Sequence, residues 1–91
     1  MEHLLVVEDD ARLADMVADY LQRSGFKISH AANAADGLQV VQSSPRVDLV
    51  ILDLMLPDAD GLEVCRKIRA LPTPMSTTPV VMLTAKGDPM D

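Results

Sequence analysis

One stretch decides the fold of this chain: Val47-Asp48-Leu49-Val50-Ile51-Leu52-Asp53. Apart from Asp48, it is aliphatic until it reaches Asp53. A short aliphatic run without polar alternation is typical of a strand that is buried on both faces at the centre of a parallel sheet. We therefore predict a strand over residues 47–52 that carries Asp53 at its C-terminal end.

Three further strands are predicted around this one. Residues 4–7 form a short aliphatic run that ends abruptly at three acids, as expected for a second strand buried on both faces. Residues 26–31 instead alternate between apolar and polar side chains, which is typical of an edge strand with one solvated side. The apolar residues 80–83 supply the fourth strand.

Three helices are predicted between these strands. The first has an apolar stripe at helical spacing, which we expect to pack on the sheet, and Gly25 is placed to end it. Asn33 is a good N-cap for the second helix, and the third opens near Asp60 and stops before a loop over residues 72–79. The stripe of the first helix comprises Leu13, Met16, Val17, Tyr20 and Leu21.

This alternation of strands and helices predicts the α/β class, with right-handed crossovers and a parallel sheet covered on both faces. The chain has 91 residues, no internal repeat and no linker, so we expect residues 1–91 to form one small domain.

Composition excludes several kinds of partner. The formal net charge of −6 argues against direct binding of nucleic acid or of an anionic membrane surface. The single cysteine, Cys65, cannot form an internal disulfide, and no signal peptide is recognisable. No apolar run approaches the roughly 20 residues that cross a bilayer. We therefore expect a cytoplasmic protein.

Polar side chains follow three of the predicted strands. Glu8, Asp9 and Asp10 follow the first, Asp53 ends the third, and Thr84 follows the fourth. Ligands of open parallel sheets bind beyond the carboxyl ends of the strands, so these side chains are expected to share one pocket. Gathered carboxylates disfavour one another's ionisation unless a cation lies between them, and oxygen ligands of this kind suit Mg²⁺.

The same pocket can carry phosphoryl chemistry. A carboxylate can attack phosphorus, and metal coordination both positions it and offsets the charge on the transferring group. Asp53 is the candidate nucleophile, and the hydroxyl of Thr84 could donate to a phosphoryl oxygen.

Simpler explanations exist for some of these residues. Asp10, which directly precedes the first helix, is expected to act as an N-cap. Thr84 alone could cap a loop. Glu8, Asp9 and Asp53 could in principle form a solvated surface, but three acids on two core strands make this the weaker interpretation.

Three segments of the chain form a recognisable set: Val6-Val7-Glu8-Asp9-Asp10, Ile51-Leu52-Asp53-Leu54-Met55-Leu56-Pro57-Asp58-Ala59-Asp60-Gly61 and Val81-Met82-Leu83-Thr84-Ala85-Lys86. In this order along the chain, they closely resemble response-regulator receiver domains. The resemblance implies a flavodoxin-like (CheY-like) doubly wound sheet of strand order 2-1-3-4, with the fifth strand and fifth helix of that family missing from the chain. The sequence of the second segment looks most like the OmpR/PhoB subfamily.

The resemblance also implies roles for individual residues. Asp53 would be the phosphoacceptor. Asp9, Asp53 and the backbone carbonyl of Met55 would hold Mg²⁺ directly, and Glu8 would act through a metal-bound water. Thr84 would be the switch hydroxyl.

The resemblance also concerns two loop residues and a lysine that is missing from this chain. Pro57 and Gly61 would shape the loop after the third strand, because proline fixes φ and glycine tolerates positive φ. Receivers also carry a phosphoryl-binding lysine at the end of the fifth strand, which this chain lacks. Lys86, two residues beyond Thr84, does not correspond to it. Without that cation, phosphorylation should be weaker.

By the same resemblance the chain is a phosphoacceptor rather than an enzyme, with at most self-phosphorylation from small donors and slow self-dephosphorylation. A sensor histidine kinase would be the donor, and dimerisation would switch a DNA-binding transcriptional effector in the parent protein. With no fifth strand, the fourth would be a bare edge. We therefore hypothesise a homodimer or higher oligomer in which residues 80–83 pair with another chain, by edge pairing or by segment exchange.

Two other functions stay open. The first is a non-phosphorylated receiver-like dimerisation module. The second is a haloacid-dehalogenase-like phosphohydrolase, because Asp58-Ala59-Asp60-Gly61 superficially resembles the nucleophile motif of that family. That motif must directly follow a buried strand, whereas the strand here is predicted to end at Asp53.

Overall fold

The computed structural model describes residues 2–43, 46–72 and 74–83. Strands and helices alternate along these ranges, as predicted. The elements are β1 (His3–Val7), α1 (Ala11–Arg23), β2 (Lys27–Ala31), α2 (Ala34–Ser43), β3 (Leu49–Asp53), α3 (Gly61–Arg69), the short 3-10 helix η1 (Pro74–Thr77) and β4 (Val80–Leu83).

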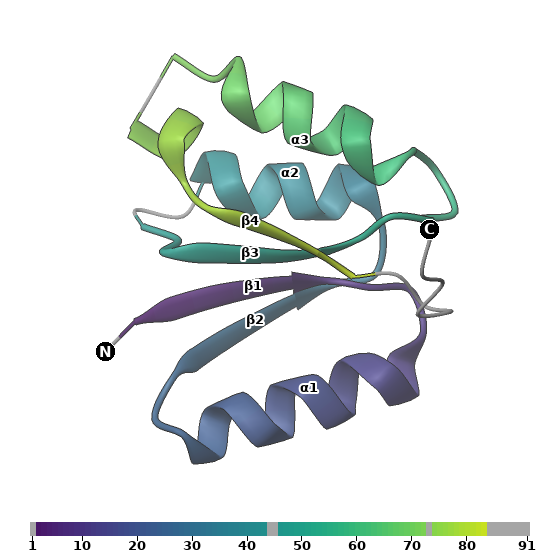
Figure 1. The fold of residues 1–91 in the computed structure, drawn as a ribbon, viewed down its shortest axis with the longest axis vertical. Coiled ribbons are helices and arrows are strands. Elements are labelled where there is room, and N and C mark those ends of the chain that lie inside the picture. Colours follow the sequence, from purple (N-terminus) through teal and green to yellow (C-terminus); the bar gives the residue numbers. More distant parts are fainter. Residues whose placement is uncertain (1, 44–45, 73, 84–91) are drawn as a thin grey trace.

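All strand pairs of the sheet are parallel, and the order is β2-β1-β3-β4 (Figure 1). This is the predicted order, with β2 at one edge. Val7 pairs with Ala31 on β2 and with Leu52 on β3, while Asp53 pairs with Leu83 on β4. The C-terminal ends of the strands therefore meet at one edge of the sheet.

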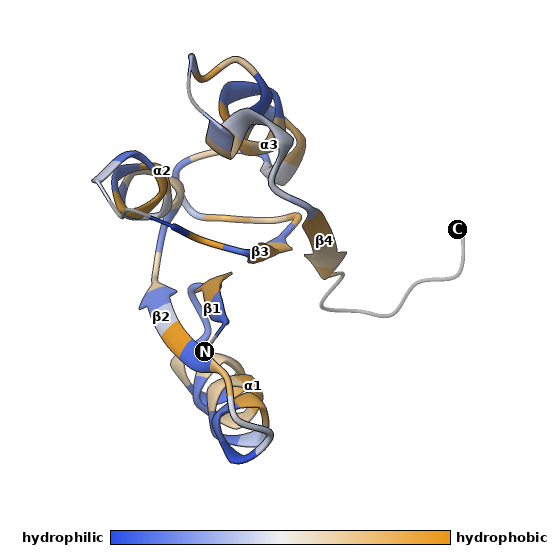
Figure 2. Ribbon diagram, turned by 90° about the vertical axis from the view of Figure 1, so that its left-hand side faces the viewer, coloured by the Kyte–Doolittle hydropathy of each residue, from blue (hydrophilic) through white to orange (hydrophobic). Residues whose placement is uncertain are grey.

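The molecule has three layers, with α1 on one face of the sheet and α2 and α3 on the other (Figure 2). The main apolar core lies between the sheet and the α2–α3 layer. Side chains from β1 and β3 fill its centre, and these two strands are the most deeply buried because each has a strand on either side and helices over it. The buried residues of this core are Leu5, Val7, Ala31, Ala34, Val41, Val47, Val50, Leu52, Val64 and Ile68.

Helix α1 begins and ends at the predicted residues. The carboxylate of Asp10 accepts from the N–H groups of Arg12 (3.0 Å) and Leu13 (3.2 Å), so Asp10 is the N-cap. Gly25 follows the helix with φ of 99°, and its N–H donates to the Gln22 carbonyl (3.0 Å). Only glycine adopts this left-handed conformation without strain, which explains why α1 ends there.

Helix α1 packs on the sheet as predicted, but two residues of its apolar stripe stay largely exposed. Met16 and Tyr20 are 68% and 71% exposed. They border an apolar groove of about 400 Å³ between α1 and the β3–β4 part of the sheet. A stripe records which face of a helix is apolar but not how much of the sheet lies opposite it. The groove is lined by Leu13, Met16, Val17, Tyr20, Leu21, Leu49, Ile51, Val81 and Leu83.

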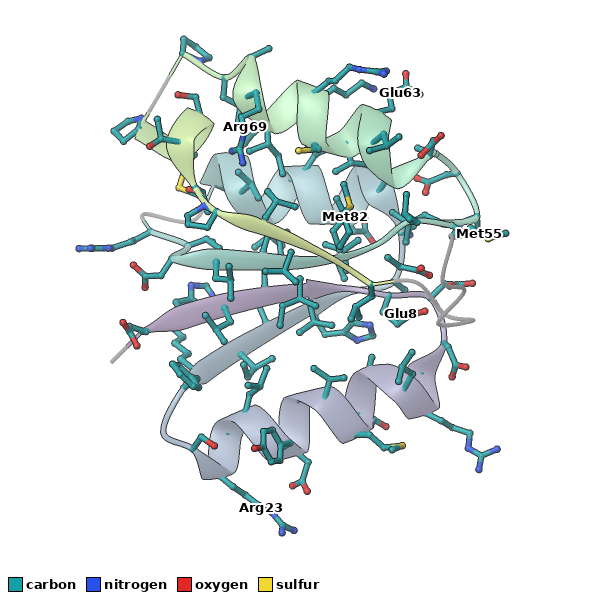
Figure 3. The ribbon with its side chains drawn as sticks, in the orientation of Figure 1. Glu8, Arg23, Met55, Glu63, Arg69 and Met82 are labelled. Carbon is teal, nitrogen blue, oxygen red and sulfur yellow. The ribbon has the colours of Figure 1, made fainter. Side chains whose placement is uncertain are left out.

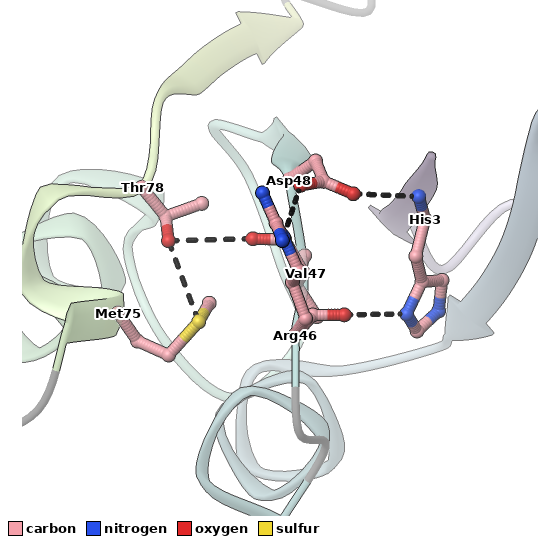
Figure 4. A network of polar contacts seen from close by, with 6 residues as sticks. All are labelled: His3, Arg46, Val47, Asp48, Met75 and Thr78. Atoms are coloured by element: carbon pink, nitrogen blue, oxygen red, sulfur yellow. Dashed lines mark hydrogen bonds and ion pairs between the residues drawn. The ribbon is translucent and has the colours of Figure 1, made fainter. Parts of the chain in front are cut away.

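Strand β3 begins at Leu49 rather than at residue 47, because Asp48 is part of a polar network (Figure 4). Its carboxylate accepts from the backbone N–H of His3 (2.9 Å) and from Nε of Arg46 (2.9 Å). The hydroxyl of Thr78 donates to the Val47 carbonyl beside it (3.4 Å). These contacts tie the start of β3 to β1 and to the segment before β4.

The loop predicted over residues 72–79 contains the short helix η1. Across the described ranges, every helix is too short or too polar to cross a membrane.

Candidate functional site

Three carboxylates converge at the C-terminal edge of the sheet. Glu8 and Asp9 directly follow β1, and Asp53 is the last residue of the neighbouring strand β3. One oxygen from each lies within 4.8 Å of the others. Glu8 and Asp53 are buried and Asp9 is exposed, so the cluster reaches from the interior to solvent. The convergence expected from the strand ends is therefore present.

The Glu8 side chain is only 2% exposed. Its Oε2 accepts from the backbone N–H of Asp10 (3.0 Å), but its Oε1 is buried and has no hydrogen-bond partner among the residues that the structure describes. Burial raises the pKa of Glu8, the Asp10 N–H opposes this effect, and the nearby charge of Asp53 adds to it. A buried carboxylate oxygen without a partner is unfavourable, and a cation or a cation-bound water would satisfy it. The residues present therefore fit a metal ion.

The backbone after β3 holds the Asp53 carboxylate. The N–H of Met55 donates to Oδ1 of Asp53 (3.2 Å), which restricts the orientation of that carboxylate. Glu8 and Met55 lie at the same end of the sheet (Figure 3). The three carboxylate oxygens lie within 4.8 Å of one another, which is close enough for them to share one cation.

Gly61 shapes the following loop for a different reason than expected. Gly25 alone among the described glycines has positive φ, so Gly61 does not need that conformation. Instead, a β-carbon on Gly61 would lie 2.6 Å from the Asp53 carbonyl oxygen and 2.9 Å from Cα of Leu54. Both are backbone atoms with little room to move. The loop is therefore closed so tightly that only a residue without a side chain fits.

Asp58 has a role that we did not predict. Its two oxygens accept from the N–H groups of Ala34 (2.8 Å) and Ala35 (3.0 Å) at the start of α2. The Ala34 N–H first, and then the Ala35 N–H, hold the pKa of Asp58 below its usual value. Asp60 caps α3 by accepting from Leu62 (2.9 Å). Both acids of the phosphohydrolase-like motif thus bind helix N-termini, which counts against that alternative.

Two residues of the sequence analysis, Thr84 and Lys86, lie outside the described residues. Strand β4 is described as far as Leu83, whose carbonyl accepts from the N–H of Leu54 (3.1 Å). Pro57 is exposed in the loop between β3 and α3, and its contribution to the shape of that loop stays a prediction.

Residues 4–91 match the family of the response regulator receiver domain. The chain belongs to this family. It is 43% identical over 89 residues to the transcriptional regulatory protein ResD of Bacillus subtilis, covering 93% of this chain and 33% of ResD. It is 44% identical over 90 residues to the DNA-binding response regulator MtrA of Mycobacterium leprae, covering 99% and 38%. The receiver chain thus spans little more than a third of the length of these relatives.

Solved structures agree with this assignment. The response regulator TrrA of Thermotoga maritima, in complex with Mg(2+)-BeF, is 33% identical with a TM-score of 0.81, covering 93% of this receiver and 70% of TrrA. Receiver domains are phosphoacceptors rather than enzymes, bind Mg²⁺ at an acidic pocket and interact with sensor histidine kinases. The family assignment therefore agrees with the chemistry expected from the acidic cluster.

Proposed function

We propose that this receiver domain accepts a phosphoryl group from a sensor histidine kinase onto Asp53, in the cytoplasm and with Mg²⁺ as cofactor. The observation that carries the proposal is the convergence of Glu8, Asp9 and Asp53, with Oε1 of Glu8 buried and without a partner in residues 2–43, 46–72 and 74–83. The similarity to TrrA, a structure with Mg(2+)-BeF, supports it.

The positions of the residues favour particular roles. Asp9 and Asp53 would hold the cation directly together with the backbone carbonyl of Met55. Glu8 would act through a cation-bound water. Asp9 is exposed, so water can complete the coordination sphere on that side. A site with few protein ligands and several waters is characteristic of Mg²⁺.

The transfer is a nucleophilic displacement at phosphorus. An oxygen of the Asp53 carboxylate attacks the phosphorus of the kinase phosphohistidine. The new P–O bond forms as the P–N bond breaks, and the imidazole leaves with the electron pair and takes up a proton. A bound Mg²⁺ would offset negative charge on the phosphoryl oxygens. The Met55 N–H orients the attacking carboxylate, and the same chemistry would allow self-phosphorylation from small donors and slow self-dephosphorylation.

Intact-mass measurement after incubation with acetyl phosphate and Mg²⁺ tests this proposal. The wild type should gain the mass of one phosphoryl group, and Asp53→Ala should gain none. Asp48→Asn, at the opposite end of the sheet, should behave as the wild type. An unmodified wild type would contradict the proposal and favour a non-phosphorylated dimerisation module.

We further propose that phosphorylation switches a DNA-binding effector in the parent protein through dimerisation, with Thr84 as the switch hydroxyl. Support comes from the relative MtrA, a DNA-binding response regulator. Pro57 and Gly61 would keep the loop after Asp53 in the shape that this response needs.

The apolar groove favours a second copy of the chain as the partner. Among the described strands β4 is the outermost on its side of the sheet, and Val81 and Leu83 on this strand line the groove. Antiparallel pairing of two β4 edges would place the same apolar side chains of both copies beside each other, which is the self-complementary arrangement of a two-fold dimer. The described residues that line the groove are all uncharged, so they add no charge repulsion to this contact.

A further inference from the structure

Asp58 connects two elements that are far apart in the sequence. It lies in the loop between β3 and α3, and its carboxylate binds the N–H groups of Ala34 and Ala35, the first two residues of α2, at 2.8 and 3.0 Å. The partners are 24 and 23 residues away along the chain. This contact is therefore tertiary and not a local helix cap.

Helix α2 also has its own cap. Oδ1 of Asn33 accepts from the N–H of Asp36 (2.8 Å), and the Asn33 carbonyl accepts from the N–H of Gly37 (3.1 Å). Asp58 supplies the acceptors for the two N–H groups that Asn33 leaves over. The start of α2 is thus held from two sides, once by its own residue and once by the loop.

The loop that contains Asp58 begins at the acidic cluster. The N–H of Met55 binds Asp53, and the backbone of Met55 pairs with that of Asp60 across the loop. The N–H of Gly61 donates to the Leu54 carbonyl (2.8 Å), which closes the loop at its base. Asp58 lies between Met55 and Asp60 in sequence, so its bonds to α2 attach the far side of the same loop to the body of the domain.

We propose that Asp58 is a positioning residue for the magnesium and phosphoryl site: by fastening this loop to α2 it keeps the backbone of Met55 in register with Asp53. The inference rests on the proposed function, because it assigns Met55 a place in the cation site. Without the bonds from Asp58 to α2, the loop is still closed by the hydrogen bond from Gly61 to Leu54, but its far side is no longer held. The Met55 carbonyl then occupies its binding position for a smaller fraction of the time, which weakens the site.

Asp58 could instead serve only to stabilise helix α2. The variant Asn33→Ala distinguishes this role from the positioning role. Asn33→Ala removes an acceptor from the same helix terminus without touching the loop. Both Asn33→Ala and Asp58→Ala should lower the urea midpoint, because both leave N–H groups of α2 without an acceptor. Only Asp58→Ala should change the cation site.

The test is calorimetric titration of Mg²⁺ into the wild type, Asp58→Ala, Asp58→Asn and Asn33→Ala, with the Met55 amide resonance as a reporter of the loop. Asp58→Ala should weaken Mg²⁺ binding about tenfold and shift the Met55 resonance. Asp58→Asn keeps one acceptor oxygen, so its Mg²⁺ affinity should lie between those of the wild type and Asp58→Ala. Asn33→Ala should bind Mg²⁺ as the wild type does.

Unchanged Mg²⁺ affinity in Asp58→Ala would overturn the inference and leave the proposed function intact. So would an equal loss in Asn33→Ala, since the effect would then come from the stability of α2. A wild type that does not bind Mg²⁺ would instead overturn the proposed function, and this inference with it. Folding of each variant is verified by its urea transition before titration.

Discussion

Gly61 lies against the backbone of Asp53 so closely that a β-carbon at position 61 would stand 2.6 Å from the Asp53 carbonyl oxygen. This contact joins the start of α3 to the end of β3, where the candidate phosphoacceptor lies. The loop between them can close only because one of the two residues has no side chain.

Gly61→Ala should therefore lower the free energy of unfolding by about 2 kcal/mol, as expected for overpacking against immobile backbone, and should weaken Mg²⁺ binding. Urea unfolding and calorimetry measure the two effects. Gly25→Ala is the control, because a β-carbon there meets nothing within 4 Å and its strain comes from φ alone. It should lose stability without losing Mg²⁺ affinity. If Gly61→Ala unfolds and binds Mg²⁺ as the wild type does, the backbone around Asp53 can move to make room for a β-carbon, which would contradict this prediction.

Glu8→Gln should stabilise the protein in the absence of Mg²⁺. The variant removes a buried charge beside Asp53, and we expect a gain of about 1 kcal/mol. Mg²⁺ should raise the melting temperature of the variant less than that of the wild type, because the variant binds the cation more weakly. Thermal unfolding with EDTA and with Mg²⁺ measures both. Equal Mg²⁺-dependent stabilisation of the two proteins would mean that Glu8 takes no part in binding.

Asp48 should contribute a pH-dependent part of the stability. The His3 N–H first, and then Arg46, hold the pKa of Asp48 below its usual value. A carboxyl whose pKa is lower in the folded than in the unfolded state stabilises the fold above its unfolded pKa, about 3.9, and loses this effect as the pH falls through the folded pKa. The stability difference between wild type and Asp48→Asn should be constant from about pH 5 to 7 and shrink at lower pH.

Urea unfolding between pH 3 and 7 measures that difference. Asp19→Asn serves as the control, because the ion pair that Asp19 forms with Arg23 across one helical turn is exposed. Its effect should be small throughout. If the difference in unfolding free energy between wild type and Asp48→Asn stays the same at pH 3 as at pH 7, the lowered pKa of Asp48 is not its source.

Val81→Lys should reduce self-association of the chain. Val81 is 48% exposed at the β4 edge and lines the apolar groove, so a lysine there would place a charge in the proposed dimer contact. Light scattering at increasing concentration should give a dimer for the wild type and a monomer for the variant. Leu62→Lys makes a similar change at a residue of equal exposure (49%) on α3 and should stay dimeric. A monomeric wild type at high micromolar concentration would refute the dimer.

Much of the fold was predictable because it depends on local patterns. The aliphatic runs that end at Glu8 and Asp53 identified two buried strands, and parallel strands necessarily bring their carboxyl ends to one edge. The caps at Asp10 and Gly25 were predictable for the same reason, since a helix end depends on the residues next to it.

Features that depend on distant parts of the chain were not predictable. The contact of Asp58 with α2 spans more than 20 residues, and an isolated acid in a loop gives no signal of it. The exposure of Met16 and Tyr20 depends on how far the sheet extends under α1, which helical periodicity does not encode. At Gly61, the sequence indicated a constrained loop but not the close contact that constrains it.

The polar network around Asp48 lies at the end of the sheet opposite to the acidic cluster. His3 also contacts the Arg46 carbonyl (2.9 Å) and the Ser29 hydroxyl (2.7 Å) through its ring, so three segments are fastened together there. The polar network that ties these segments together and the carboxylates that would bind the cation thus lie at opposite ends of the sheet. A spectroscopic label attached near the Asp48 network would therefore sit on firmly held segments and far from the cation site.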